Sequence, residues 1–180
     1  MKSTGILLGA RRSKFPNDLN SKIIIGIDPG LTGGFSVFLG KELIRSEVLK
    51  RKEDCLDASW LAKQLCDWNP SHIILEKVHA MPGQGVSSMF KFGQVFGTIK
   101  SVIDILEFDY DEVPNQAWPR YFFGNTRNKE IKNKDRNIDF ACKLWPDFDF
   151  TATEKSKKPH TGKVDSALIG YYGVCKRTGL

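Results

Sequence analysis

Three acidic residues, Asp28, Glu76 and Asp165, stand where their carboxylates could take part in cation-dependent chemistry. Asp28 ends an apolar run and precedes a Pro-Gly turn, so a strand would hold its carboxylate rigidly at an open edge. Glu76 ends a second apolar run, where an unpaired buried carboxylate would be costly. Oxygen-only ligands favour Mg²⁺ or Mn²⁺ over zinc. If the three acids converge, they can hold two such cations about 4 Å apart for in-line displacement at a phosphate.

Each acid also has a simpler interpretation, and one run of residues suggests another class of enzyme. Asp28 could cap a turn, and Asp165 could complement a helix dipole from the first turn. The run Asp28-Pro-Gly-Leu-Thr-Gly33 also fits actin-like and sugar-kinase ATPases, which open with a strand, an Asp and a glycine turn. Their fold needs two such domains and a second phosphate loop, for which 180 residues are too few.

The elements that must position these acids follow from hydrophobic periodicity. We expect strands near 22–28, 33–39, 42–48, 72–76 and 108–113, and helices near 56–68, 86–106, 134–145 and 163–176. This order predicts an α/β, ribonuclease-H-like fold with a mixed five-stranded sheet flanked by helices. In such a sheet the strand that ends in Glu76 lies beside the strand that ends in Asp28. Asp165 would then open the last helix, close to both strand ends.

Composition favours one domain. Hydrophobic residues make up 41% of the chain, enough for a full core, and no apolar run approaches the about 20 residues of a membrane span. We expect residues 1–20 to form a flexible basic leader and residues 21–180 to form a single domain. The four cysteines form no C-x-x-C pair, which favours reduced packing residues in a cytoplasmic protein.

The charge is uneven along the chain. Residues 1–114 contain 14 Lys and Arg against 14 Asp and Glu, whereas residues 115–180 contain 13 against 7, so the whole excess of +6 lies in the last third. A basic part on a neutral body indicates a surface for a polyanion, with an ordinary solvated surface as the alternative.

Four segments of the chain together resemble the signature segments of RuvC-type Holliday junction resolvases. They are Gly26-Ile-Asp-Pro-Gly30, Leu75-Glu-Lys-Val78, Phe92-Gly-Gln-Val-Phe-Gly97 and Val164-Asp-Ser-Ala-Leu-Ile169. The combination of Met81-Pro-Gly-Gln-Gly85 with Lys157-Lys-Pro-His160 is similar to the phage and chloroplast branch. The resemblance covers about residues 22–176 and implies a homodimer that nicks opposed strands of a four-way DNA junction. It also implies Asp28, Glu76 and Asp165 as ligands of Mg²⁺, for which Mn²⁺ substitutes, and a bacterial or phage-infected cell, with an organelle as the alternative.

One position departs from the family's pattern. The family usually has a fourth catalytic group, His or Asp, three or four residues before the last acid, whereas His160 precedes Asp165 by five. The loop containing Gly162 could return His160 to the cluster as a ligand or proton-transfer group. Lys163 could instead stabilise charge on the phosphate. A solvated loop histidine and a lysine that merely binds a phosphate are the alternatives.

The resemblance also implies a DNA-binding surface around the acids. In the family a side chain from the loop after Glu76 enters the junction, and His79 and Met81 are the candidates here. Gln84 and Ser87 offer donors to a phosphate near a helix N-terminus. Contacts to the backbone of the junction arms are expected from two basic clusters: Lys129, Lys132, Lys134 and Arg136, and Lys157 and Lys158.

The helix expected near 86–106 corresponds to the one that forms much of the dimer interface in the family. Its Gly93 and Gly97 would allow another backbone to approach closely, and Phe90 and Phe96 could face the partner. Packing of these rings within one subunit is the alternative.

Three other functions compete with junction resolution. Another ribonuclease-H-like nuclease, acting on RNA–DNA hybrids or flaps, would share the metal chemistry but act as a monomer. A catalytically silent junction-binding protein would follow if the shift of His160 spoils the site, although the retained acids argue against it. An actin-like ATPase ranks last because of the length of the chain.

Overall fold

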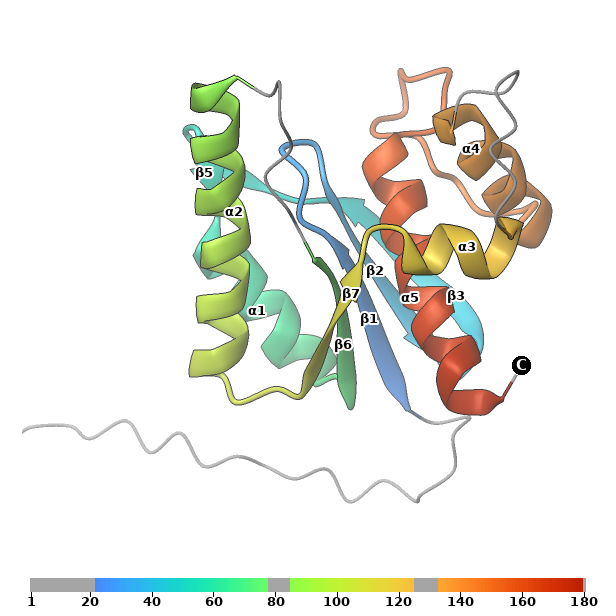
Figure 1. Cartoon of the computed structure of the whole chain (residues 1–180), viewed down its shortest axis with the longest axis horizontal. Helices are drawn as coiled ribbons and strands as arrows, with labels where there is room; N and C mark the ends of the chain where they lie inside the picture. Colours follow the sequence, from blue (N-terminus) through green and yellow to red (C-terminus); the bar gives the residue numbers. More distant parts are fainter. Residues whose placement is uncertain (1–21, 78–84, 125–132, 180) are drawn as a thin grey trace, which may run out of the picture.

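The computed structural model describes residues 22–77, 85–124 and 133–179, and it contains the predicted five-stranded mixed sheet. The strand order is β3-β2-β1-β6-β7, and the bounds are β1 Ile23–Asp28, β2 Gly34–Leu39, β3 Glu42–Val48, β6 His72–Lys77 and β7 Tyr110–Pro114. The first three strands pair antiparallel, and β1, β6 and β7 pair parallel, as Figure 1 shows. The predicted leader, residues 1–20, lies outside the described ranges.

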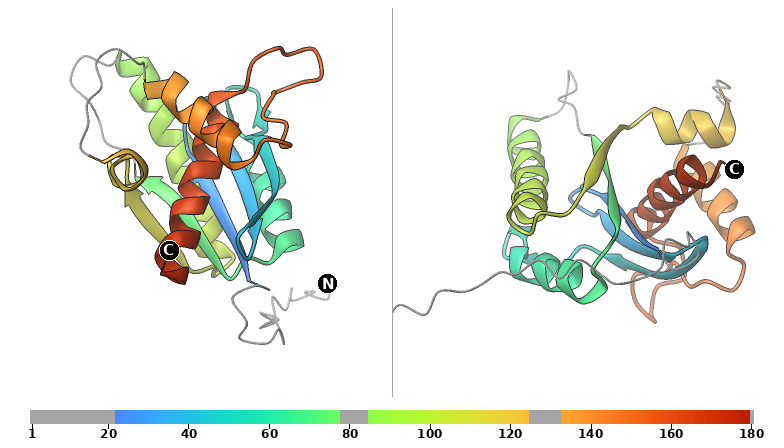
Figure 2. Two further views of the ribbon diagram at one scale, coloured as in Figure 1. Left: turned by 90° about the vertical axis from the view of Figure 1, so that its right-hand side faces the viewer. Right: turned by 90° about the horizontal axis from the view of Figure 1, so that it is seen from below.

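Helices cover both faces of the sheet. α1 (Ala58–Trp68) and α2 (Val86–Ile105) lie on one face, and α3 (Ala117–Phe123), α4 (Asn133–Leu144) and α5 (Thr161–Thr178) lie on the other (Figures 1 and 2). A hydrophobic cluster fills each interface. Because both faces are buried, β1 before Asp28 and residues 73–75 of β6 are runs without polar alternation.

Local signals explain where the helices differ from the sequence prediction. The predicted helix near 56–68 begins later, at Ala58, because Asp57 caps it and accepts a hydrogen bond from the Trp60 N–H at 3.0 Å. Leu56 pairs instead in a small hairpin of β4 (Arg51–Lys52) and β5 (Cys55–Leu56). The sequence prediction missed α3, whose Pro119 is tolerated because it lies in the first helical turn.

The four cysteines are free, as predicted, but their positions differ from the prediction. Cys55, Cys66 and Cys142 are exposed and only Cys175 is buried, so the description as packing residues was wrong for three of them. No helix in the described part of the chain is long and apolar enough to cross a membrane.

Helix α5 lies directly on the backbone of β1 and β2. A Cβ added to Gly26 would lie 2.3 Å from the carbonyl oxygen of Ser166 and 2.4 Å from the backbone nitrogen of Gly170. A Cβ added to Gly34 would lie 2.0 Å from the carbonyl oxygen of Gly162. Only glycine fits such an approach, so these positions set the distance between the helix and the sheet.

Buried hydroxyl groups reinforce the same contact. Ser36 Oγ donates to Ser46 Oγ at 2.9 Å and lies 2.6 Å from Ser166 Oγ. Ser46 Oγ in turn donates to the carbonyl oxygen of Lys163 at 2.9 Å. Because each buried hydroxyl has a partner, the network joins β2, β3 and α5 without a desolvation penalty left uncompensated.

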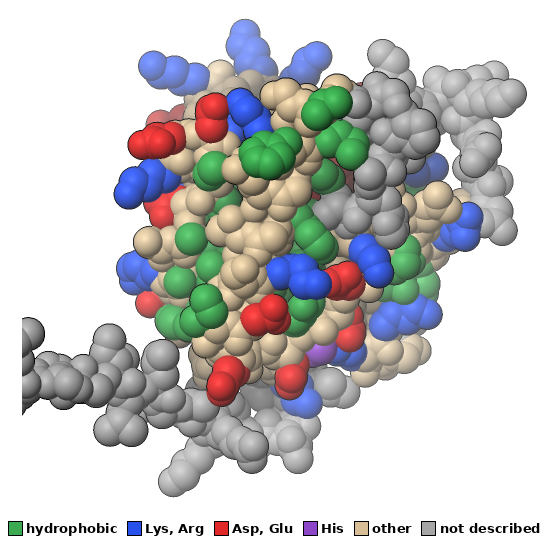
Figure 3. Space-filling model, turned by 60° about the vertical axis from the view of Figure 1, so that its left-hand side comes forward, with side chains coloured by type: hydrophobic (Ala, Val, Ile, Leu, Met, Phe, Trp, Pro, Cys, Tyr) green, Lys and Arg blue, Asp and Glu red, His purple; other side chains and the backbone are tan. Residues whose placement is uncertain are grey.

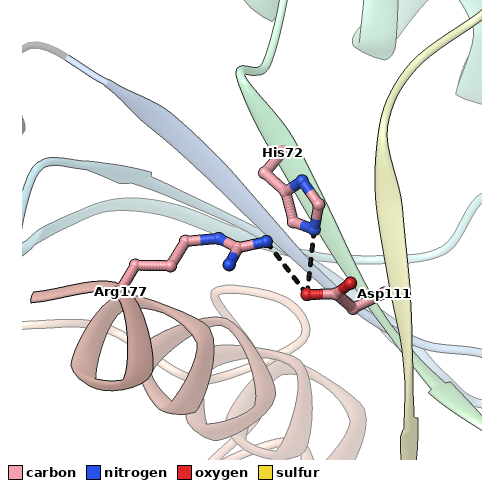
Figure 4. Close-up of polar contacts among 3 residues, drawn as sticks. All are labelled: His72, Asp111 and Arg177. Carbon is pink, nitrogen blue, oxygen red and sulfur yellow. Dashed lines mark hydrogen bonds and ion pairs between the residues drawn. The ribbon is translucent and has the colours of Figure 1, made fainter. Parts of the chain in front are cut away.

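The far end of α5 is attached to the sheet by a charged contact. Arg177 Nη2 donates to Asp111 Oδ2 at 2.9 Å, and His72 Nε2 lies 3.1 Å from the same oxygen (Figure 4). Burial and the nearby Arg177 lower the pKa of His72, so its imidazole is neutral at pH 7 and Arg177 supplies the ionic contact. Asp111 is exposed, and such a pair contributes at most about 1 kcal/mol.

We predict that Gly26→Ala destabilises the protein by about 3 kcal/mol, because the new methyl group would push α5 away from β1. Gly85→Ala is the control. Among the described residues, the nearest atom to an added Cβ there is Ser88 Oγ at 4.0 Å, and the expected effect is below about 1 kcal/mol. Urea unfolding followed by circular dichroism measures both. Equal unfolding midpoints for the two variants would show that α5 can shift without loss.

Candidate active site

The three predicted acids gather around the carboxyl ends of two parallel strands, β1 and β6. Asp28 is the last residue of β1, and Glu76 lies near the end of β6. The residues before them, Ile27 and Leu75, are register partners in this parallel pair. The two acids therefore lie at neighbouring positions on adjacent strands, as predicted. Asp165 comes from α5, but the prediction that it opens the helix was wrong. The helix begins at Thr161, so Asp165 lies in its second turn.

A neutral N–H group holds one oxygen of each carboxylate. The pairs are Gly30 N with Asp28 Oδ1 at 3.0 Å, Trp118 Nε1 with Glu76 Oε1 at 2.9 Å, and Asn137 Nδ2 with Asp165 Oδ1 at 2.9 Å. Within the described ranges, no donor reaches the second oxygen of any of the three. As far as the described residues go, one oxygen of each acid accepts no hydrogen bond, and a cation could bind there.

Burial and mutual repulsion disfavour the charged forms of the acids. Burial, followed by repulsion from Glu76 and Asp165, raises the pKa of Asp28 to about 8. Burial is also the main cause that raises the pKa of Glu76 and that of Asp165. Lys134 opposes this trend and lowers the pKa of Asp28 and of Asp165. The cluster is thus deficient in positive charge, which a divalent cation would supply.

The donor set fits a hard cation, although the ligands do not form a closed cage. Within residues 22–77, 85–124 and 133–179, no three His, Cys, Asp or Glu side chains lie close enough together to hold a metal ion as they stand. The raised pKa values show that the three carboxylates nevertheless act on one another electrostatically. Carboxylate oxygens with unused lone pairs suit Mg²⁺ or Mn²⁺.

Lys163 is engaged away from the three acids. Its Nζ donates to the carbonyl oxygens of Asp149 and Thr151 at 2.8 and 2.9 Å, and the carboxylates that face it are those of Asp149 and Glu47. These bonds attach the segment 149–160 to α5. The catalytic role predicted for Lys163 stays a prediction, and no described contact connects its ammonium group with the acids.

His160 occupies the N-cap position of α5. Its backbone N–H donates to the carbonyl oxygen of Phe150 at 2.8 Å, and its Nδ1 is buried with no hydrogen-bond partner among the described residues. Burial and the charge of Lys163 lower the pKa of His160, so the imidazole is neutral at pH 7 and can accept a proton. Its predicted part in catalysis stays a prediction.

Half of the predicted DNA-contacting residues can be placed. His79, Met81, Gln84, Lys129 and Lys132 lie outside the described residues. Ser87, Lys134, Lys157 and Lys158 are exposed, whereas Arg136 is half-buried with its guanidinium 4.0 Å from the centre of the Phe123 ring. The start of α2, α4 and the segment 149–160 lie at the same end of the molecule as the acids (Figures 1 and 2).

Sequence reasoning missed two residues that touch the acids. Trp118 was missed because α3 was not recognised. Asn137 could have been recognised from the sequence. Its spacing places it on the same buried face of α4 as Ala141 and Leu144, where an apolar residue is expected. Lys134, predicted as a DNA contact, also proves to be the cation that acts on Asp28 and Asp165.

Comparison with known proteins gives matches in structure alone. No protein-family model and no curated protein sequence matches the chain. RuvC of T. thermophilus in complex with Holliday junction substrate is 14% identical, with a TM-score of 0.59 over 88% of this chain and 96% of that chain. Fowlpox virus resolvase in complex with substrate Holliday junction DNA is 17% identical, with a TM-score of 0.55 over 86% of this chain and 98% of that chain.

These likenesses show the fold of the chain. The chain has the α/β, ribonuclease-H-like fold that was predicted, in the form found in Holliday junction resolvases. The predicted resemblance to RuvC-type resolvases is therefore confirmed for the fold, and the assignment to the phage and chloroplast branch stays a prediction.

We predict that Asp28→Asn stabilises the protein in EDTA, and more so as the pH rises. The carboxyl group has an ordinary pKa of 3.8 and a folded-state pKa of about 8, so the folded state binds more protons between these values. Its stabilising contribution is present below pH 3.8 and is lost as the pH rises through 8. The melting midpoint of Asp28→Asn should exceed that of wild type far more at pH 8.5 than at pH 5. In a domain of this size, each kcal/mol gained in the free energy of unfolding raises the midpoint by about 2–4 °C.

The control for this titration is Asp104→Asn, which replaces an exposed acid on α2. Its melting difference from wild type should lack the rise towards pH 8. Added Mn²⁺ at pH 8 should raise the midpoint of wild type and have a smaller effect on Asp28→Asn. A pH-independent difference for Asp28→Asn would mean that the acids are not electrostatically crowded.

Proposed function

We propose that this protein is a Holliday junction resolvase, a divalent-cation-dependent endonuclease that nicks opposed strands of a four-way DNA junction. The observation that carries the proposal is the cluster of three carboxylates at the carboxyl edge of the sheet, each with one free oxygen and a raised pKa. The structural likeness to RuvC and to the fowlpox resolvase, both solved with Holliday junctions, supports the choice of substrate.

Asp28, Glu76 and Asp165 would hold the cations, which we propose to be two Mg²⁺ ions per site with Mn²⁺ as a substitute. Mg²⁺ bound there would lower the pKa of an attacking water and would offset the negative charge of the leaving 3′ oxygen. The three carboxylates would fix the positions of the cations, and Lys134 offsets part of the negative charge of the carboxylates. Neutral His160 suits the role of a proton acceptor.

The basic end of the molecule would bind the junction arms. Lys134, Lys157 and Lys158 are exposed on the segments that surround the acids, and Ser87 is exposed in the first turn of α2. Contacts of this kind neutralise phosphates and recognise the shape of the branch rather than its sequence. His79 or Met81 would enter the crossover from the loop after β6.

A homodimer would place two such sites on opposed strands. The outer face of α2 exposes Val86, Phe90 and Ile105 at 88%, 68% and 70%. At Gly93 and Gly97 on the same helix, no atom of the described residues lies within 4 Å of an added Cβ, so a second backbone has room to approach. Figure 3 shows this side of the molecule, where hydrophobic side chains lie along both sides of a tan strip that carries few charged groups. The pattern supports a two-fold interface along α2.

We predict that Asp28→Asn, Glu76→Gln and Asp165→Asn each lower the cleavage rate at least about 10³-fold while junction affinity stays within about threefold. The substrates are a mobile four-way junction, an RNA–DNA hybrid and a linear duplex in Mg²⁺, with products mapped on a denaturing gel. Asp111→Asn, which removes a distant acid, should cleave like wild type. Preferred cleavage of the hybrid would favour another ribonuclease-H-like nuclease, and binding without cleavage by wild type would favour a silent junction-binding protein.

We predict that Phe90→Glu converts a dimer into a folded monomer, because it places two charges in the proposed α2 interface. Sedimentation velocity at micromolar concentration measures the change, and circular dichroism checks the fold. Ile44→Glu, at a residue exposed on the edge strand β3, is the matched control and should remain dimeric. A wild-type protein that is monomeric with and without junction DNA would contradict the proposal of paired nicking.

A further inference from the structure

Two buried side chains outside the proposed ligand set contact the acids. Trp118 on α3 is 4% exposed, and its Nε1 donates to Glu76 Oε1 at 2.9 Å. Asn137 on α4 is 7% exposed, and its Nδ2 donates to Asp165 Oδ1 at 2.9 Å. These donors come from the helices between β7 and α5, so they are independent of the elements that carry the acids.

Both contacts constrain a carboxylate without neutralising it. An indole N–H can only donate, and the amide donates through Nδ2, so each occupies one oxygen and adds no charge. Once one oxygen is held, rotation of the carboxylate about its last torsion breaks the hydrogen bond. The direction of the free oxygen is therefore set by the position of Trp118 or of Asn137.

Packing alone does not explain Asn137. Its Oδ1 is buried with no partner among the described residues, which is unfavourable compared with an apolar side chain of similar size. The neighbours on its side of α4, Ala141 and Leu144, belong to the hydrophobic cluster beneath the helix. An asparagine retained in this apolar layer is accounted for by its bond to Asp165.

Asp28 needs no such side chain. Its Oδ1 accepts from the backbone N–H of Gly30 in the turn that follows β1. The three acids thus share one arrangement, in which a neutral donor holds one oxygen and the other oxygen is free, and two of the donors are side chains.

We propose that Trp118 and Asn137 are positioning residues, which aim Glu76 and Asp165 so that α3 and α4 set the cation affinity of the site. The proposal rests on the function proposed above, because it concerns the same cation site. It predicts that cation affinity falls when either donor is removed, while the fold and the surface that binds DNA are unchanged.

The test is Mn²⁺ binding to the full chain without DNA, followed by the electron paramagnetic resonance signal of free Mn²⁺. Trp118→Phe and Asn137→Leu keep most of the buried volume and remove the donor, and each should weaken Mn²⁺ binding about 10-fold or more. Trp145→Phe is the matched control, since Trp145 packs against Phe38 and Tyr171 and should leave Mn²⁺ affinity unchanged. Asn137→Ala, which also lacks a donor, serves as a second variant if the leucine does not fold.

A second readout separates positioning from a structural role. Single-turnover cleavage by the variants should fall at low Mn²⁺ and recover as Mn²⁺ is raised, with junction affinity and the melting midpoint in EDTA close to wild type. Wild-type Mn²⁺ affinity in Trp118→Phe and in the folded Asn137 variant would overturn the proposal and leave the proposed function standing. Absence of Mn²⁺ binding by wild type would instead reject the cation-dependent function and this inference with it.

Discussion

The direct contact between α5 and the backbone of β1 and β2 is the constraint on which the candidate site depends. Asp28 lies on β1 and Asp165 on α5, so the distance between this strand and this helix determines how far apart the two carboxylates are. Gly26 and Gly34 allow that separation to be short, because a side chain at either position would collide with the backbone of the helix. The buried serine network then prevents the helix from sliding along the sheet.

A second constraint is electrostatic and acts in the opposite direction. Packing brings the acids together, but their charges repel one another in a poorly hydrated place, as the raised pKa of Asp28 shows. The apolar clusters on both faces of the sheet supply the stability that offsets this repulsion. The charged forms of the three acids are unfavourable without a counterion, and such electrostatic repulsion is typical of sites that bind cations.

The sheet and the neighbouring positions of Asp28 and Glu76 could be predicted from the sequence, because the two buried parallel strands are visible as apolar runs followed by acids. The sequence did not reveal the partners of those acids. Trp118 and Asn137 reach them only through the tertiary placement of α3 and α4, and the Pro119 in α3 concealed that helix. The spacing of His160 and Lys163 before Asp165 did not reveal their contacts either, since both residues donate hydrogen bonds to carbonyl oxygens within residues 149–151.

The close packing of Gly162 limits which residues could ever extend the acidic cluster along α5. A Cβ on Gly162 would lie 2.1 Å from the carbonyl oxygen of Thr32, so the position three residues before Asp165 admits no side chain at all. Of the two positions at which the family usually has its fourth catalytic group, three or four residues before the last acid, Gly162 has no room for a side chain and Thr161 is half-buried. The turn after β1 therefore excludes a side chain from the position of α5 that lies one turn before Asp165.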